Sequence, residues 1–370
     1  MFPKIFNKLS KKTTVLVVPL DWGLGHATRC IPIIKELQLN GCDVIIAAET
    51  KVQSLLQSEF QQLTFIPLPG YRVNYSRKQY WLPLKILVQI PKILYHVYVE
   101  HGWLKKVEKK FKIDAVIADN RFGLFHKHVP SIYITHQLLI KTGTVFTERI
   151  ARNLHYRFIK KYTACWVPDF EGHENLAGEL SHAAVVPDNV NYIGCLSRFE
   201  LSTTPKKEIE LLIILSGPEP QRSIFEELVL TQLKSFAGAA MLVRGLPGNH
   251  ERLATTEMTG DNIIIKNHLT ATELNDAILN AAWVIARSGY TTVMDLVKLK
   301  QRAILVPTPG QTEQEYLADH LMDKQLFFSV KQDEFVLEKA LQQASNFPFI
   351  MPNLDMNLYK STIRQFVESL

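Results

Sequence analysis

Residues 286–295 read Ala-Arg-Ser-Gly-Tyr-Thr-Thr-Val-Met-Asp and follow a short apolar run that is typical of a buried strand. A glycine turn between a strand and a hydroxyl-rich helix start offers backbone N–H and side-chain O–H donors to an anion such as a phosphate. Asp295 lies about one helical turn later, where its carboxylate could accept hydrogen bonds from two adjacent ribose hydroxyls. The alternative is an ordinary helix start with a hydroxyl cap. The predicted ligand-binding residues of this stretch are Arg287, Ser288, Gly289, Thr291, Thr292 and Asp295.

The loop that follows Pro307 is rich in amide and carboxyl side chains. Such groups donate and accept hydrogen bonds and suit the hydroxyl groups of a sugar. The residues concerned are Gln311, Gln314 and Glu315. The second half of the chain therefore combines groups suited to phosphate, ribose and sugar.

A second glycine turn stands near the start of the chain, where Gly23 and Gly25 follow a β-branched apolar run. Glycines at this position leave N–H groups at the positive end of a helix, which suits an anion. The full dinucleotide fingerprint is absent, because residues 27–29 lack the third glycine, so the turn alone is a weak signal. His26 can take a proton near neutral pH. A capping or structural role for His26 is the alternative.

Two further polar residues, Asp119 and His136, each end a predicted strand. A carboxylate beside an imidazole can orient it and stabilise its protonated form. The alternative for Asp119 is a cap on the next turn. Arg121 follows closely, so the local group is polar enough to serve a ligand.

The elements that must position these residues alternate between strand and helix. This alternation predicts an α/β protein with two doubly wound domains, whose ligands bind at the carboxyl ends of parallel strands. Helices are expected over 27–39, from about 272, and over 359–367. The predicted strands are 14–19, 42–48, 62–67, 113–118, 131–135, 165–168 and 190–193, then 211–215, 240–244, 262–266, 283–286 and 303–306.

The predicted boundary between the domains lies near residue 200. Residues 206–210 are charged and follow Ser-Thr-Thr-Pro, which favours a linker. We therefore expect one Rossmann-like domain over 1–200 and a second over 201–350. Residues 351–370 are expected to form a C-terminal helix that packs back toward the first domain.

Residues 283–318 resemble the C-terminal donor-binding motif of the family-28 glycosyltransferases. In that motif an Arg-Ser-Gly turn precedes a Thr and then an acidic residue that holds the donor ribose. The family's Gln-Gln pair, which contacts the donor sugar, corresponds to Gln314 and Glu315, so the second position differs and sugar selectivity stays open. The resemblance implies the GT-B fold of two facing Rossmann-like domains, with the acceptor side in the domain 1–200 and the nucleotide-sugar site in the domain 201–350. The matching residues, in order, are Arg287, Ser288, Gly289, Thr292 and Asp295.

Looser matches extend over nearly the whole chain. The turn from Gly23 to His26 resembles the family's acceptor-side glycine loop, and Arg222 could replace backbone contacts to the diphosphate, because the second-domain glycine loop is incomplete here. The resemblance thus places further residues at the two substrates. The acceptor-side or glycine-loop residues are Gly23, Gly25, Arg121 and His136, and the additional donor-side residues are Arg198, Ser216, Gly217, Arg222 and Arg244.

The implied activity is an inverting, metal-independent sugar transfer. The donor would be a nucleotide diphosphate sugar, such as UDP-N-acetylglucosamine, and the acceptor a glycan or a lipid-linked molecule. His26, oriented by Asp119, would be the catalytic base. No cofactor is expected, and the absence of an Asp-x-Asp pair favours helix ends and arginines over a metal as the stabiliser of the leaving group. Two rivals are a UDP-sugar hydrolase or epimerase on the same fold, and a non-catalytic subunit that binds a nucleotide sugar.

Composition limits the remaining classes. With 46% hydrophobic and 21% charged residues, the chain is of ordinary globular type, and a net charge of +6 does not argue for nucleic acid. Four cysteines without metal-ligand spacing favour reduced thiols in a cytoplasmic protein. No run approaches the roughly 20 apolar residues of a membrane span.

Residues 80–112 combine aromatic and aliphatic side chains with lysines. This composition suits an interfacial helix on anionic lipid, at the inner face of the cytoplasmic membrane. An amphipathic core helix with a solvated basic end is the alternative.

Overall fold

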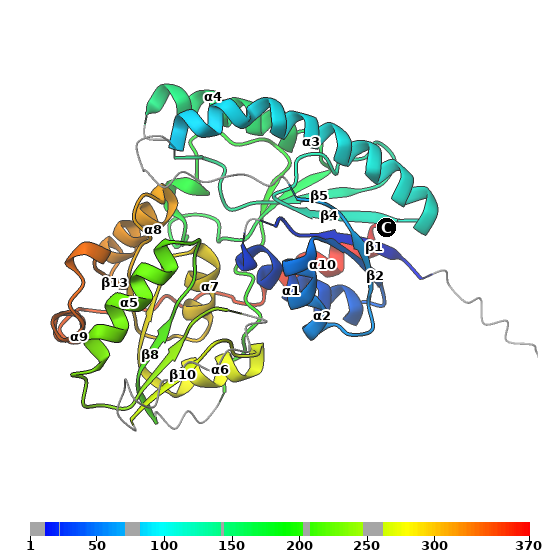
Figure 1. Cartoon of the computed structure of the whole chain (residues 1–370). Coiled ribbons are helices and arrows are strands. Elements are labelled where there is room, and N and C mark those ends of the chain that lie inside the picture. The colour runs from blue at the N-terminus through cyan, green and yellow to red at the C-terminus, as the bar shows by residue number, and fades with distance from the viewer. Residues whose placement is uncertain (1–11, 22, 71–81, 142–143, 203–207, 247–261) are drawn as a thin grey trace, which may run out of the picture.

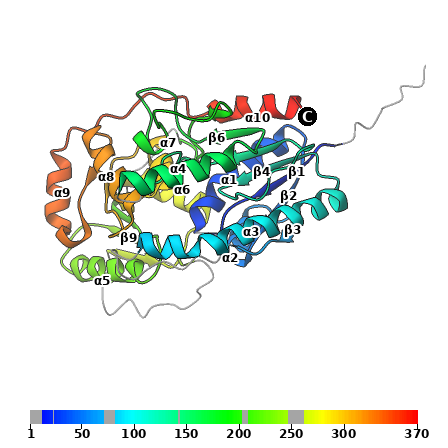
Figure 2. The same ribbon diagram turned by 90° about the horizontal axis from the view of Figure 1, so that it is seen from above.

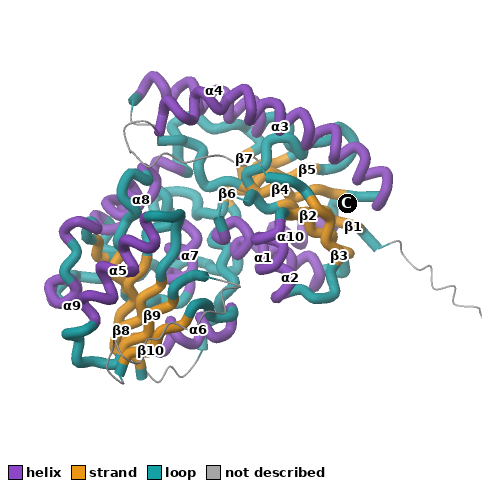
Figure 3. Tube along the Cα trace, viewed as in Figure 1, coloured by secondary structure: helices purple, strands orange, loops and turns teal. Residues whose placement is uncertain are grey.

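The computed structural model describes residues 12–21, 23–70, 82–141, 144–202, 208–246 and 262–370. The chain forms two α/β domains that lie side by side, each with its own sheet (Figures 1 and 3). The prediction of two doubly wound domains is therefore confirmed.

The first sheet is parallel and has the order β3-β2-β1-β4-β5-β6-β7. The order reverses next to β1, so the loops after β1 and β4 lie side by side at the carboxyl edge, where doubly wound sheets bind ligands. The strands are β1 (Thr14–Val18), β2 (Asp43–Ala48), β3 (Thr64–Pro67), β4 (Ala115–Asp119), β5 (Ser131–Ile134), β6 (Ala164–Val167) and β7 (Val190–Tyr192).

Helices cover both faces of this sheet (Figures 1 and 2). Along β1, Val15 and Val17 pack into the core beneath α1, whereas Leu16 and Val18 pack into the core on the α3 face, as the alternation of side chains along a strand requires. One face carries α1 (Leu24–Leu39), α2 (Thr50–Glu59) and α10 (Leu358–Glu368), and the other carries α3 (Leu82–Phe111) and α4 (Val145–Ile159).

The second sheet is also parallel, in the order β10-β9-β8-β11-β12-β13. Helices α5 (Gln221–Leu233) and α9 (Leu337–Ser345) pack on one face. Helices α6 (Ala271–Asn280) and α7 (Tyr290–Lys298) pack on the other, and α8 (Thr312–Asp323) follows β12. The strands are β8 (Ile209–Ile214), β9 (Ala240–Val243), β10 (Ile263–Lys266), β11 (Ala281–Ala286), β12 (Ala303–Leu305) and β13 (Phe328–Ser329).

The C-terminal helix α10 packs against α1 of the first domain. Tyr359 and Ile363 are buried there, and the ring of Phe366 meets Trp166 edge-on at 5.4 Å between centroids. The chain thus passes from the first domain to the second before β8 and returns after α9.

Two boundaries that were predicted from the sequence are wrong, namely the linker between the domains and the start of the first helix. The expected linker 206–210 already contains the start of β8, because Ile209 pairs with Ala281 of β11. Helix α1 begins at Leu24 and not at Ala27, because Gly23 adopts a φ of 121° and serves as its N-cap. Gly23 thus supplies a backbone turn that residues other than glycine rarely adopt.

Candidate functional site

His26 and Asp119 meet at the carboxyl edge of the first sheet. His26 lies in the first turn of α1, and Asp119 is the last residue of β4, which pairs with β1. The imidazole Nδ1 lies 3.0 Å from Asp119 Oδ2. The Asp119 side chain is fully buried, whereas 18% of the His26 side chain stays exposed. The structure therefore brings together the two residues that the sequence suggests for acid–base chemistry.

Arg29 is a third member of this group that the sequence analysis missed. Its Nε donates to Asp119 Oδ2 at 2.8 Å, and its Nη2 bonds Asp119 Oδ1. The same Nη2 lies 2.9 Å from His26 Nδ1. Arg29 stands three residues after His26 on one helix, a spacing that places both side chains on the same face. That spacing was the available signal.

The charges of this group follow from burial and pairing. Burial lowers the pKa of His26; the Asp119 carboxylate raises it and the Arg29 guanidinium lowers it, with a net shift below the usual value. Burial alone would raise the pKa of Asp119, but Arg29 and His26 more than offset this, and the pKa of Asp119 is lowered. At neutral pH, His26 is therefore neutral and Asp119 is ionised.

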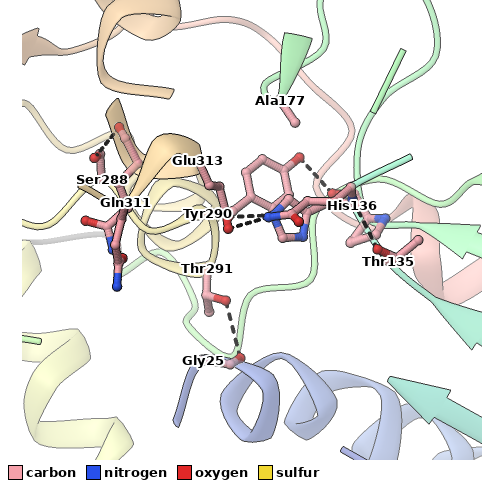
Figure 4. Close-up of polar contacts among 12 residues, drawn as sticks. Gly25, Thr135, His136, Ala177, Ser288, Tyr290, Thr291, Gln311 and Glu313 are labelled. Atoms are coloured by element: carbon pink, nitrogen blue, oxygen red, sulfur yellow. Dashed lines mark hydrogen bonds and ion pairs between the residues drawn. The ribbon is translucent and has the colours of Figure 1, made fainter. Parts of the chain in front are cut away.

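His136, at the end of β5, connects this group to the second domain (Figure 4). Its Nδ1 lies 3.2 Å from Arg29 Nη1, and its Nε2 lies 2.7 Å from Glu313 Oε1 of α8. The amide of Gln137 donates to the other oxygen of Glu313. If Arg29 donates to Nδ1, then Nε2 carries the hydrogen that Glu313 accepts. Glu313 was not singled out from the sequence, because its partners His136 and Gln137 lie more than 170 positions away.

The start of α7 faces the start of α1 across the domain interface. Gly289 caps α7 without a side-chain hydrogen bond, and the Thr291 hydroxyl donates to the carbonyl of Gly25 at 3.3 Å (Figure 4). The ring of Tyr290 stacks on His136 at 4.4 Å between centroids, and its hydroxyl donates to the carbonyl of Pro168. The positive end of α7 is thus held beside the His26 group.

Asp295, on the second turn of α7, lies against the segment that leaves the first domain. Ser197 Oγ donates to Asp295 Oδ1 at 2.5 Å. Burial raises the pKa of Asp295 to about 6, although Arg198 and the Ser197 hydroxyl lower it. Among the described residues, the buried Nε of Arg198 has no hydrogen-bond partner. Two predicted donor-side residues that are far apart in the sequence, Arg198 and Asp295, therefore interact electrostatically in the structure.

Arg287 is almost fully buried and is used inside the second domain. Its Nη1 donates to the carbonyls of Val306 and Pro307 at 3.1 Å each, and its Nη2 donates to Gln221 O and Gln332 Oε1. Burial lowers the pKa of Arg287 to about 10. These bonds hold the carboxyl end of β12 in place, so in this structure Arg287 supports the loop, and its contact with a donor stays a prediction.

The other two predicted arginines of the second domain share one carboxylate. Arg222 Nη1 donates to Glu226 Oε2 at 2.7 Å, and Arg244 Nε donates to the second oxygen of Glu226. Arg222 also bonds Glu219 at 2.6 Å. Ser216 and Gly217 lie exposed after β8, and Gly217 has a φ of 104°. The arginine pair stabilises this edge of the second sheet.

The amide-rich loop before α8 bonds mainly to itself. Gln314 Oε1 accepts from Thr308 N at 2.9 Å, its Nε2 donates to Gln311 Oε1, and Glu315 Oε1 accepts from Gly310 N at 2.8 Å. Ser288 Oγ donates to the carbonyl of Gln314 at 2.7 Å (Figure 4). This network fixes the loop beside the start of α7. Thr292 lies half-buried on α7.

Arg121, predicted on the acceptor side, is fully buried beneath the first sheet's carboxyl edge. Its Nε donates to Pro19 O at 3.1 Å and its Nη1 donates to Glu100 Oε1 at 2.7 Å. Arg121 thus ties α3 to the end of β1, and in this structure it supports the edge instead of lining the interface.

The residues that the structure describes contain no group of three or more His, Cys, Asp or Glu that could hold a metal ion. Within the same residues, no helix has both the length and the apolar character of a membrane span.

Residues 223–348 match the Glycosyltransferase family 28 C-terminal domain. This range contains α7, α8 and the loop between them. The match and the two-domain fold together support a glycosyltransferase of the GT-B fold whose second half resembles family 28. The expectations of fold and enzyme class are therefore confirmed. No curated protein sequence matches the chain.

Solved structures share this fold over almost the whole chain. The glycosyltransferase SnogD from Streptomyces nogalater superposes with a TM-score of 0.63 at 10% identity and covers 97% of this chain and 100% of its own. Spinosyn rhamnosyltransferase SpnG complexed with thymidine diphosphate gives 0.60 at 11% identity, covering 96% and 95%. Acinetobacter baumannii MurG gives 0.51 at 16% identity, covering 96% and 95%. At these identities the likeness shows the fold alone.

Proposed function

We propose that this protein is an inverting, metal-independent glycosyltransferase that moves a sugar from a nucleoside diphosphate donor to a hydroxyl acceptor. The observation that carries the proposal is the meeting of two groups at one interface. The His26–Asp119 pair of the first domain lies beside the start of α7, whose Thr291 contacts Gly25. A base and an anion-binding helix end thus face one another.

For the donor, we propose that the diphosphate lies at the start of α7 and that Asp295 accepts hydrogen bonds from the ribose. The carboxylate of Asp295 and the guanidinium of Arg198 attract one another electrostatically. The family-28 match covers this helix, and SpnG, on the same fold, binds thymidine diphosphate. By the family resemblance we propose a uridine diphosphate sugar, with UDP-N-acetylglucosamine as the first donor to test.

For the chemistry, we propose that His26 Nδ1–H donates to Asp119 and that Nε2 removes the proton of the acceptor hydroxyl. The acceptor oxygen then bonds to the anomeric carbon while the bond from that carbon to the phosphate oxygen breaks. The leaving diphosphate carries the negative charge toward the N–H groups of α7. A direct displacement of this kind inverts the anomeric configuration.

For the acceptor, we propose a lipid-linked molecule or glycan reached from an anionic membrane surface. Helices α3 and α4 lie on the same outer face of the first domain (Figure 2). Large apolar side chains are exposed there, with Tyr98 at 78%, Phe146 at 73% and Tyr95 at 65%. Lys105, Lys106 and Arg149 are exposed on the same helices. Aromatic and basic groups on one face suit the headgroup region of anionic lipid. Trp81 and Tyr80 lie outside the described residues.

The membrane contact is tested by co-sedimentation with vesicles of phosphatidylglycerol and phosphatidylcholine. We expect Tyr95→Ser/Tyr98→Ser/Phe146→Ser to lower the bound fraction several-fold, because buried apolar area drives interfacial binding. Leu39→Ser removes a side chain that is 80% exposed at the far end of α1 and is the matched control. Equal binding of both variants would reject this face as the contact.

The donor and the reaction are tested together. Calorimetric titration with UDP-, dTDP- and GDP-sugars, with Mg²⁺ and with EDTA, should show one preferred donor whose affinity is independent of metal. Asp295→Ala should weaken that affinity about 10-fold or more, because a charged hydrogen bond contributes about 1.5–3 kcal/mol. If the protein binds the donor and rapidly releases its sugar without any acceptor, the proposed activity is hydrolysis of the donor and not transfer. Binding to none of the donors would reject the proposed site.

A further inference from the structure

Two charged groups compete for one nitrogen of His26. Asp119 Oδ2 lies 3.0 Å from Nδ1 and Arg29 Nη2 lies 2.9 Å from the same atom. In neutral imidazole a ring nitrogen either carries a hydrogen or accepts one. Nδ1 therefore satisfies Asp119 or Arg29, and not both. If it donates to Asp119, Nε2 is free to accept a proton. If it accepts from Arg29, Nε2 carries the hydrogen.

Arg29 also occupies the carboxylate that would stabilise a protonated His26. Its Nε and Nη2 bond both oxygens of Asp119 in a forked arrangement, and both side chains are almost fully buried. The negative charge of Asp119 is therefore already neutralised by a partner that stays charged. An imidazolium at His26 would have to share Asp119 with Arg29 and would lie against the Arg29 cation.

We propose that Arg29 is a positioning residue that keeps His26 unprotonated at neutral pH, by neutralising Asp119 and by placing a positive charge beside Nδ1. Its role as helper of a base rests on the proposed function, whereas its effect on the protonation of His26 does not. A His–Asp pair without this arginine would hold a proton more tightly.

The remaining charged groups around His26 come from two other elements. His136 at the end of β5 bonds Arg29 Nη1, and Glu313 of α8 lies beyond it. Both interact electrostatically with His26 as well. His136 and Glu313 bond one another at 2.7 Å, whereas Asp119 and Arg29 are the charged groups within hydrogen-bond distance of His26 Nδ1.

The test is an NMR titration of the imidazole in the full-length protein, which needs no substrate. The His26 signal is assigned by its loss in His26→Gln. In the wild type we expect a protonation midpoint below the usual value of about 6.5. In Arg29→Gln we expect the midpoint to rise by about 1 to 3 pH units, because removal of a cation within hydrogen-bond distance frees the Asp119 charge. Lys35→Gln, which removes an exposed lysine from the same helix, should leave the midpoint unchanged.

A wild-type midpoint above the usual value would overturn the proposal even if Arg29→Gln failed to fold. So would an unchanged midpoint in a folded Arg29→Gln, or an equal rise in Lys35→Gln. Arg29→Lys keeps the charge but not the fork, and its midpoint should lie nearer to wild type than that of Arg29→Gln. If transfer is detected, kcat/KM can be measured against pH in the wild type and the Arg29 variants. The pH at which kcat/KM falls on the acid side should shift by the same amount as the NMR midpoint of His26. Absence of transfer in the wild type would reject the proposed function and leave the titration result standing.

Discussion

At the scale of single residues, Asp295 is a donor-side carboxyl whose ionisation is made costly by burial. Its carboxyl is buried between α7 and the Ser197–Arg198 segment, and burial raises its pKa to about 6. A carboxyl that binds its proton more tightly in the folded state than in the unfolded chain favours folding at low pH. This contribution is complete below the unfolded value of 3.8 and is lost as the pH rises to about 6.

We therefore predict that Asp295→Asn raises the unfolding free energy relative to the wild type at neutral pH, where Asp295 is ionised, and lowers the affinity for the donor. Between pH 4 and pH 6 the unfolding free energy of the wild type should fall relative to the variant by about 2 kcal/mol, because one pKa unit corresponds to about 1.4 kcal/mol and most of the shift from 3.8 to about 6 lies in this range. Chemical denaturation at several pH values measures this. Donor affinity should fall by about 10-fold or more. A difference in stability that does not vary with pH would contradict the raised pKa.

His26 permits a second prediction at this scale. His26→Ala should lower kcat for transfer by about 10²- to 10⁴-fold with little effect on donor affinity, because general-base catalysis contributes that much. Radiolabelled sugar transfer and calorimetry measure the two quantities. A variant that keeps the full transfer rate would remove His26 from the role of base.

The sequence predicted some residues of this site, missed others and assigned two buried arginines to ligands. His26 and Asp119 were found because they lie at a helix start and a strand end, where chemistry in doubly wound sheets is expected. Asp295 was found because it follows the glycine turn by about one helical turn. Arg29 was missed because it lies one turn inside α1, although its spacing from His26 pointed to it. Arg287 was assigned to a ligand by its place in the family motif, and Arg121 because it follows Asp119. Their burial and their bonds to backbone carbonyls depend on the packed structure, which no local pattern encodes.

At the scale of elements, α8 joins the second domain to the first at several places. Glu313 in its first turn reaches His136 and Gln137, and further along the Tyr316 hydroxyl accepts from Glu179 N at 2.7 Å. The latter contact falls on the short helix η2 (Gly178–Leu180). The sequence predicted neither contact, because helix periodicity reports a buried face and does not name its partner.

We predict that Glu313→Gln weakens the link between α8 and the His26 group. The amide keeps one acceptor for His136 but loses the charge that pairs with it, so kcat/KM should fall by about 10-fold, in line with about 1.5 kcal/mol for a charged hydrogen bond. Asp319→Asn, an exposed position on the same helix, is the control and should retain wild-type values. Steady-state kinetics decides, and a rate equal to that of the control would show the contact to be dispensable.

Gly178 gives a separate prediction for the contact between α8 and η2. A Cβ there would lie 2.4 Å from the Tyr316 hydroxyl and 2.7 Å from the His320 ring, and the residue has a φ of +55°. Gly178→Ala should therefore lower the unfolding free energy by about 1–3 kcal/mol through overpacking and backbone strain. Gly172→Ala has a φ of +85° without any atom within 4 Å, and so isolates the backbone effect. Equal losses in both variants, measured by denaturation, would mean that the packing against α8 contributes nothing.

At the scale of the whole molecule, the repeated alternation of strand and helix was enough to predict two doubly wound domains. Buried parallel strands such as β4 and β11 are continuous apolar runs, which the sequence displays openly. Strand β13, with two residues, and helices α4 and α9 were not predicted. A two-residue strand has no periodicity, and it exists only because β12 offers it an edge.

The double passage of the chain between the domains determines how they can move. One connection leaves the first domain after β7, and the other returns between α9 and α10. Two covalent connections define a line, so the second domain can rotate about that line more easily than it can twist or slide across it. Such a rotation carries the start of α7 toward or away from α1 along one fixed arc. The distance between the proposed base and the leaving group would then depend on one rotation angle. A pair of fluorophores on α1 and α7 could follow that distance during turnover.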